Sequence, residues 1–324
     1  MTPRMKLVGL AIAGYLFFAL TSGPAHAQLL GHNYPGDNGL MSGSQAPPGW
    51  MLTAMYLDYD GDTLRGNDGE SIAIDPEERG SLDVNSLAIG FNGVTEFKVL
   101  GANYGFMVFP AFTNNVFEAP ILGLTEKVGT GLTDLYVQPI NLGWHTERAD
   151  FLAGLGIFAP TGRYEADADD NLGMGMWSFE IFGGTTVFLD KAKSWHFATT
   201  AFYETHTEKK GTDIKVGDIL TLEGGVGGSF MQGAANAGLA YWAQWKVTDD
   251  EPGSELQPVF DALQLGRHRG YGFGPEITLP IATKKKLIAL VNARYLWETG
   301  VRNQLEGSHF TLAVTFPIPS VKLQ

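Results

Sequence analysis

Two neighbouring stretches decide the fold: residues 148–160 read RADFLAGLGIFAP, and residues 176–190 read MWSFEIFGGTTVFLD. In both, apolar side chains recur at every second position and not at the three-to-four spacing of a helix. Glycines stand inside the runs, and one charge, Glu180, is surrounded by apolar neighbours. This pattern predicts β-strands that are apolar on one face and carry glycine and charge on the other.

The same alternation recurs along most of the chain and predicts twelve strands. They are expected near residues 50–60, 84–92, 95–109, 132–142, 149–159, 176–189, 194–206, 214–231, 234–247, 266–280, 286–298 and 307–317. Asn92-Gly93, between the second and third runs, is a strong signal for a two-residue hairpin. Long connections, among them 110–131 and the last hairpin loop 299–307, alternate with short turns. Loops sorted by length in this way are typical of a transmembrane barrel.

The predicted fold class is therefore all-β: a transmembrane antiparallel up-and-down β-barrel of about 12 strands, spanning residues 50–317. Short turns are expected on the periplasmic side and long loops on the extracellular side. Only helices and closed barrels pair every backbone N–H and C=O inside a bilayer, and the chain after the N-terminus has no run of 18 apolar residues that would form a spanning helix. Residues 318–324 are expected to form a C-terminal tail.

The N-terminus carries export signals. Residues 1–27 combine two basic residues, Arg4 and Lys6, with an apolar run over 7–20 and the small-residue site Ala25-His26-Ala27. This order predicts a cleaved signal peptide, because about 14 apolar residues are too few to span a bilayer as a helix. The expected destination is the outer membrane.

Residues 28–49 are dominated by glycine, proline, serine and asparagine, so an irregular segment is expected. Two placements remain open: a periplasmic leader, or a segment inserted into the lumen. An extended chain of this length reaches far into a barrel, and a barrel of about twelve strands is too wide to be filled by its own side chains. The candidate plug residues are His32, Pro35 and Pro47.

Composition limits the partners. The net charge of −13 provides no basic face for nucleic acid. The chain has no cysteine, so no disulfide stabilises it. The expected surroundings are outer-membrane lipid and lipopolysaccharide, and the oligomeric state is left open. The acidic stretch DADDN at 167–171 lacks the glycine and the final glutamate of a calcium loop, and neither a metal nor a cofactor is predicted.

Strand parity predicts which side chains face the lumen, because a charge facing the lipid midplane costs about 2–4 kcal/mol. Glu180, Glu223, Glu276 and Arg294 fall on four different runs. They would form a luminal charge network, or they would be solvated in a wide water-filled pore. The full set of lumen-lining candidates is Asp134, Gln138, Glu180, Glu223, Gln244, Glu276, Asn292, Arg294 and Glu298.

No catalytic motif accompanies these residues. The histidines that follow the predicted signal peptide are His32, His145, His196, His206, His268 and His309, and none lies in a nucleophile or metal-binding motif. The protein is therefore not predicted to be an enzyme.

Several segments together resemble a known family of outer-membrane proteins, named for the meta-cleavage pathway of phenol degradation. The resemblance lies in GHNYPGDNGLMSGSQAPPGW at 31–50, KVLGANYGFMVFP at 98–110, GLTDLYVQPINLGWH at 131–145, APTGRYEADADDNLGMGMWSF at 159–179, GGSFMQGAANAGLAYWAQWKVTDDEPGS at 227–254 and RGYGFGPEITLP at 269–280. The chain departs from the pattern at its end, TFPIPSVKLQ, which lacks a terminal aromatic residue.

The resemblance implies a β-barrel that takes up small hydrophobic or aromatic solutes. The alternative is a structural or surface-exposed barrel that acts through its acidic loops without transport. A transporter would have an open polar path through its lumen, whereas a structural barrel would have a lumen filled by interlocked charges.

Overall fold

The computed structural model describes residues 29–71, 80–119, 124–166, 168, 170–231, 235–254, 257–258, 260, 266–284 and 286–318. The predicted signal peptide and residues 319–324 lie outside the described residues. No helix in the described parts of the chain is long and apolar enough to cross a membrane.

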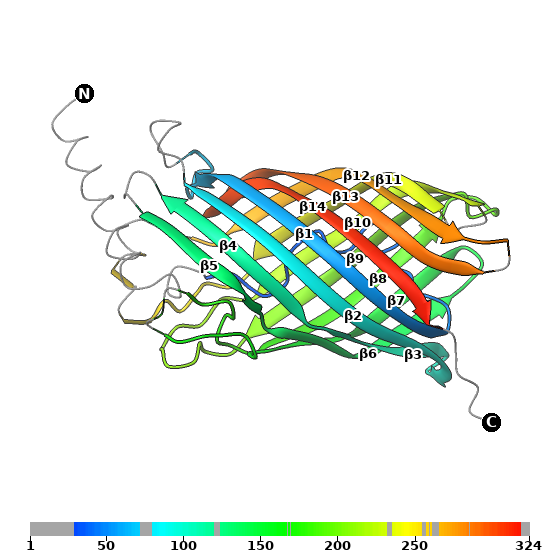
Figure 1. Ribbon diagram of the computed structural model, residues 1–324, viewed down its shortest axis with the longest axis horizontal. Coiled ribbons are helices and arrows are strands. Elements are labelled where there is room, and N and C mark those ends of the chain that lie inside the picture. The colour runs from blue at the N-terminus through cyan, green and yellow to red at the C-terminus, as the bar shows by residue number, and fades with distance from the viewer. Residues whose placement is uncertain are drawn as a thin grey trace.

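Strands tilted against the long axis form an elongated barrel (Figure 1). The described residues contain fourteen strands: β1 (Gly49–Arg65), β2 (Ser81–Val99), β3 (Ala102–Phe109), β4 (Ala111–Ala119), β5 (Leu124–Leu132), β6 (Leu135–His145), β7 (Ala149–Ala159), β8 (Ser178–Phe188), β9 (Trp195–His206), β10 (Ile219–Phe230), β11 (Ala235–Lys246), β12 (Arg269–Ala282), β13 (Leu287–Arg302) and β14 (Gln304–Ile318).

The sheet is antiparallel and closed, because β1 pairs with both β14 and β2. Two of its strands are interrupted. β3 and β4 pair with successive parts of β2, and β6 and β5 pair with β3 and β4 in turn. Pro110 separates β3 from β4, and residues 133–134 separate β5 from β6. The fourteen segments therefore form twelve barrel strands, which confirms the predicted barrel and its strand number.

The predicted hairpin at Asn92-Gly93 is wrong. β2 runs straight through this pair, and Asn92 lies opposite Met51 on one side and Met107 on the other. Gly93 is a strand glycine because the Trp50 ring occupies the space that a Cβ atom would need. The turn comes later, at Leu100 and Gly101, whose φ angles of 50° and 84° match the backbone of a tight hairpin.

Two predicted long loops are also wrong. Most of 110–131 forms β4 and β5, whose pairing extends the barrel wall at the long-loop end (Figure 1). Most of 299–307 belongs to β13 and β14, which are joined by a tight turn at Asn303 with φ 52°. In both places polar residues that suggested a loop continue a strand, because a barrel strand can extend beyond the bilayer into water.

The two faces of the barrel differ as the opening stretch predicts. In β8, Phe179 and Ile181 are 46% and 60% exposed on the outer face. The alternate residues Ser178, Glu180 and Phe182 are buried inside. The outer face is thus apolar over the strands, as a lipid-facing surface must be.

Candidate functional site: the filled barrel interior

The barrel is filled by the chain that precedes β1. We call residues 29–48 the inner segment. At the long-loop end, the Leu29 carbonyl accepts a hydrogen bond from Lys246 Nζ (2.7 Å), at the end of β11. At the short-turn end, Gln45 Nε2 donates to carbonyl oxygens of Asn103 in β3 and Asn141 in β6. The inner segment therefore runs the length of the barrel before Gly49 begins β1.

The outer end of the inner segment lies under the long loops. Leu29 packs in an apolar cluster with Met176, Ile214, Val216 and Ile219. Lys209, in the loop that follows β9, is 2% exposed beside this cluster. Burial lowers the pKa of Lys209 from its usual 10.5 to about 8, because an ammonium group loses hydration there.

His32 stands at the centre of a polar cluster at this end. Its backbone N–H donates to Glu204 Oε1 (2.7 Å). Its ring Nδ1 lies 2.6 Å from Ser178 Oγ, which in turn lies 2.8 Å from His206 Nδ1. Its ring Nε2 lies 2.8 Å from Asp134 Oδ2. His32 thus joins the inner segment to β8, β9 and the junction of β5 and β6.

Asp134 orients this histidine. Besides His32, its carboxylate accepts backbone N–H bonds from Gly162 (2.9 Å) and Met174 (2.7 Å), both in the long loop after β7. An ionised carboxylate only accepts hydrogen bonds, so His32 Nε2 must carry the proton that it donates to Asp134. In the neutral ring, Nδ1 therefore keeps a free lone pair that points toward Ser178 and Glu204.

Glu180 and Gln138 form the next layer. Glu180 Oε2 accepts a hydrogen bond from Asn33 Nδ2 (2.7 Å), and Oε1 accepts one from Tyr136 OH (2.7 Å). Gln138 Nε2 donates to the same tyrosine oxygen (2.9 Å), and Gln138 Oε1 accepts from Asn141 (3.0 Å). Both predicted residues are buried and belong to one network that includes the inner segment.

Glu276 and Arg294 form a buried ion pair halfway along the barrel, with Arg294 Nε 2.9 Å from Glu276 Oε2. Glu276 also accepts from Asn292 Nδ2 (2.9 Å) and from the backbone N–H of Leu40 (3.1 Å). Arg294 Nη1 donates to the Gly36 carbonyl. This pair thereby holds the turn in the middle of the inner segment.

The remaining predicted residues bind the segment or its surroundings. Glu223 Oε2 accepts from the Asn38 backbone N–H (2.6 Å). Gln244 Nε2 donates to the Asn33 carbonyl (3.2 Å). Glu298 differs, since it accepts hydrogen bonds from Tyr59 OH (3.3 Å) and the Gly307 N–H (2.9 Å), which both belong to the wall.

Close backbone approach secures the inner half of the segment. A Cβ atom on Gly43 would lie 2.1 Å from the Thr185 carbonyl carbon of β8. One on Gly39 would overlap the Glu276–Arg294 pair. Only glycine fits at such contacts. Of the two candidate prolines, Pro35 is buried in the interior and Pro47 is exposed near the short-turn end.

Sequence reasoning missed Ser178, Glu204 and His206, although the parity rule reaches them. β9 alternates strictly, and His196, Thr200, Glu204 and His206 all fall on its buried face. The specific partners could not be read from the sequence, because His32 and Glu204 are 172 residues apart.

Ser178, His32 and Asp134 follow one another like a serine–histidine–acid set, but the set is not arranged for catalysis. Ser178 is fully buried, and its hydroxyl is shared between two histidine rings. A nucleophile must reach a substrate carbonyl from an open side. What the cluster offers is several convergent polar atoms in a dry site, suited to fastening one chain segment to another.

A closed twelve-stranded barrel with an apolar outer face and a chain segment through its lumen defines the class: an outer-membrane-type β-barrel. The COG4313 outer membrane channel from Pseudomonas putida F1 has a similar fold, with a TM-score of 0.69 and 13% sequence identity over 89% of this chain and 100% of the other. The β domain of the Bordetella autotransporter BrkA is more distant, with a TM-score of 0.46 and 13% identity over 84% and 100% of the two chains. No curated protein matches the chain.

Residues 61–314 match the family described as "Putative MetA-pathway of phenol degradation". The chain belongs to this family, and the resemblance seen in the sequence is thereby confirmed. The fold is that of outer-membrane β-barrels.

Proposed function

We propose that the protein is an outer-membrane channel that admits small hydrophobic or aromatic solutes, and that the inner segment constricts its path. The observation that carries this proposal is the inner segment itself: it follows the barrel axis from Leu29 to Gln45 and is bound to the wall at both ends. Family membership supports a link to phenol degradation.

One exposed side chain in the inner segment supports a narrow path beside it. The side chain of Asp37 is exposed, although its neighbours Pro35 and Gly36 are buried. At the long-loop end, a depression of about 250 Å³ is lined in part by Pro160, Tyr164 and Trp177. These rings give an aromatic solute apolar surface to contact before it enters.

A second function has a specific observation in its favour. The Glu276–Arg294 pair and the hydrogen bonds of Glu180, Glu223 and Asn33 interlock the segment with the wall. A lumen filled in this way is what a structural barrel, acting through its external loops, would have. The two functions differ in one property, solute flux.

Uptake by intact cells tests the proposal. Cells of an outer-membrane-bearing host that make the protein are expected to take up labelled phenol at low micromolar concentration faster than cells with the empty vector. Labelled arabinose, a polar solute of similar size, serves as the control and is expected to enter at equal rates in both. Equal phenol uptake, with the protein folded in the outer membrane, would contradict transport and favour the structural barrel.

A further inference from the structure

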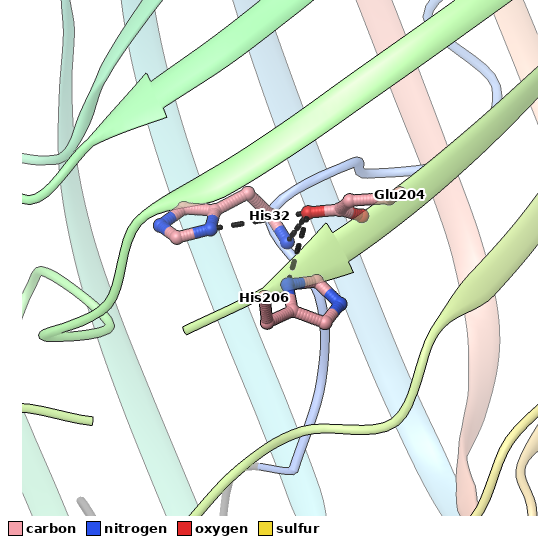
Figure 2. Close-up of side chains that lie close together, drawn as sticks. All are labelled: His32, Glu204 and His206. Atoms are coloured by element: carbon pink, nitrogen blue, oxygen red, sulfur yellow. Dashed lines mark hydrogen bonds and ion pairs between the residues drawn. The ribbon is translucent and has the colours of Figure 1, made fainter. Parts of the chain in front are cut away.

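His32, Glu204 and His206 converge on one point inside the barrel, at its long-loop end (Figure 2). His32 Nδ1 lies 3.9 Å from Glu204 Oε1, and His206 Nδ1 lies 3.7 Å from the same oxygen. The three potential ligand atoms all lie within 4.8 Å of one another. We propose that these residues form a binding site for a divalent first-row transition metal, with zinc as the reference ion.

The ligand types fit this class of ion. Two imidazole nitrogens and one carboxylate oxygen are ligands that zinc, nickel and copper accept. Ligand atoms about 2.1 Å from a tetrahedral zinc lie about 3.4 Å apart. The separations of 3.9 and 3.7 Å from the two rings to Glu204 Oε1 would close by about half an ångström around a metal, and the separation of the two rings, within 4.8 Å, would close by up to about 1.4 Å.

Asp134 supplies the outer support that metal-binding histidines use. It accepts the Nε2 proton of His32, which leaves the Nδ1 lone pair facing the site. A carboxylate on the far nitrogen fixes the tautomer and strengthens the ligand, as in carboxylate–histidine–zinc arrangements. Ser178 Oγ now bridges the two Nδ1 atoms, at 2.6 and 2.8 Å, and would give up this bridge when a metal binds.

Charge favours a cation at this point. Glu204 is 1% exposed and Asp134 is 7% exposed, and their ion pairs among the described residues are with His32 and His206. A buried carboxylate without full compensation is costly. A divalent ion would offset both.

A surface depression lies on the wall near the site. The depression of about 250 Å³ at the long-loop end is lined by Gly162, Trp177 and Thr207, among others. Gly162 donates its backbone N–H to Asp134 (2.9 Å). Trp177 and Thr207 are chain neighbours of the buried residues Ser178 and His206, and their own side chains are exposed on the opposite face of the wall. Since His32 belongs to the inner segment and the other two ligands to β9, a bound metal would fasten the outer end of the segment to the wall. The binding proposal does not depend on solute transport.

Isothermal titration of the full chain in detergent with Zn²⁺, after removal of metals with a chelator, tests the site. One zinc ion per chain is expected. His32→Gln and His206→Gln are each expected to weaken binding by at least about 100-fold, the upper range for losing even an outer-sphere partner. His145→Gln is the matched control, since His145 pairs with Asp150 at the short-turn end, and it is expected to bind as the wild type does.

Two results would overturn the proposal: no zinc binding by the wild type, or binding that is undiminished in both variants. Should the variants fail to fold, anomalous scattering at the zinc edge from crystals of the wild-type chain decides. A peak between His32, Glu204 and His206 supports the site. A peak elsewhere, or none, contradicts it.

Discussion

The two halves of the inner segment are held in different ways. Its outer half, residues 29–38, is bound by ionisable wall residues: Glu204 and Glu180 accept from His32 and Asn33, and Glu223 accepts from Asn38. Its inner half, residues 39–48, has two bonds to carboxylates, from Leu40 to Glu276 (3.1 Å) and from Ser44 to Asp150 (2.8 Å), and adds neutral amides and close backbone packing, as at Gln45 and Gly43.

This difference shows where the segment can be released. Hydrogen bonds to a charged acceptor are roughly twice as strong as neutral ones, but they are lost if the charge is neutralised or captured by another ligand. The inner half continues directly into β1 and cannot leave the barrel. Any opening of the lumen must therefore begin at the outer half, where the polar cluster holds His32.

The largest effect is expected where the halves meet. Arg294→Met leaves Glu276 buried without its cation and removes the bond to Gly36. Breaking a buried ion pair in this way costs about 3–5 kcal/mol of unfolding free energy, measured by urea titration of the folded barrel. The double variant Glu276→Gln, Arg294→Met is the control and should recover much of the loss. A loss below about 1 kcal/mol in the single variant would show that the pair does not hold the segment.

The next prediction concerns Lys209, in the loop that lies over the outer half of the inner segment. Because the pKa of Lys209 falls from 10.5 to about 8 on folding, the folded chain binds this proton more weakly than the unfolded chain does. Unfolding therefore takes up a proton between pH 8 and 10.5. Below pH 8 the buried ammonium group lowers the free energy of unfolding, and this loss is recovered as the pH rises to 10.5.

Lys209→Met removes the cost, so at pH 7 it should be more stable than the wild type by up to about 3 kcal/mol. The difference should shrink as the pH approaches 10, which urea titrations of both proteins at several pH values would reveal. A difference that stays constant with pH would mean that the ammonium group keeps its hydration on folding.

Overpacking tests the inner half. Gly43→Ala places a methyl group against the backbone of β8 and is expected to cost about 1–3 kcal/mol. Gly129→Ala in β5 is the matched control, because no atom lies within 4 Å of its added Cβ, and its effect should stay within about 0.5 kcal/mol. Equal urea midpoints for the two variants would mean that the segment can move away from β8 freely.

The last prediction compares the two halves directly. Asn33→Ala leaves a buried carboxylate, Glu180, without one partner, at a cost of about 1.5–3 kcal/mol. Gln45→Ala removes two bonds to neutral oxygens of Asn141, at about 0.5–1.5 kcal/mol each, so its total cost is similar but falls on the other half. Protease sensitivity of residues 29–38 should accordingly rise in the first variant and not in the second. A rise in protease sensitivity in Gln45→Ala and not in Asn33→Ala would contradict this account of the two halves.

Most of the barrel could be predicted from the sequence, because one face of each strand meets lipid and must be apolar, so apolar residues recur at every second position. Phe179, Ile181 and their neighbours follow it without exception. The errors arose where a local turn signal conflicted with alternation. Asn92-Gly93 suggests a turn, but the Trp50 ring from the neighbouring strand covers Gly93. This contact joins residues far apart in the sequence, so the residues around Gly93 do not predict it.

The site was predictable in part. Parity alone selected Glu180, Glu223, Glu276 and Arg294, and the structure brings each of them against the inner segment or a residue that binds it. What could not be predicted is which residue meets which. The pairing of His32 with Asp134, Ser178 and Glu204 depends on how far the segment rises through the lumen, which no spacing in the sequence records.

Single-channel conductance in planar lipid bilayers tests the central claim, that the inner segment limits passage through the barrel. The full chain is compared with a variant lacking residues 29–46, and heat-modifiable gel mobility verifies that both are folded. Since the twelve-stranded barrel is wide enough to leave a water-filled lumen once the segment is gone, the deletion is predicted to raise conductance severalfold and to weaken discrimination between solutes. Unchanged conductance with unchanged selectivity would contradict the claim.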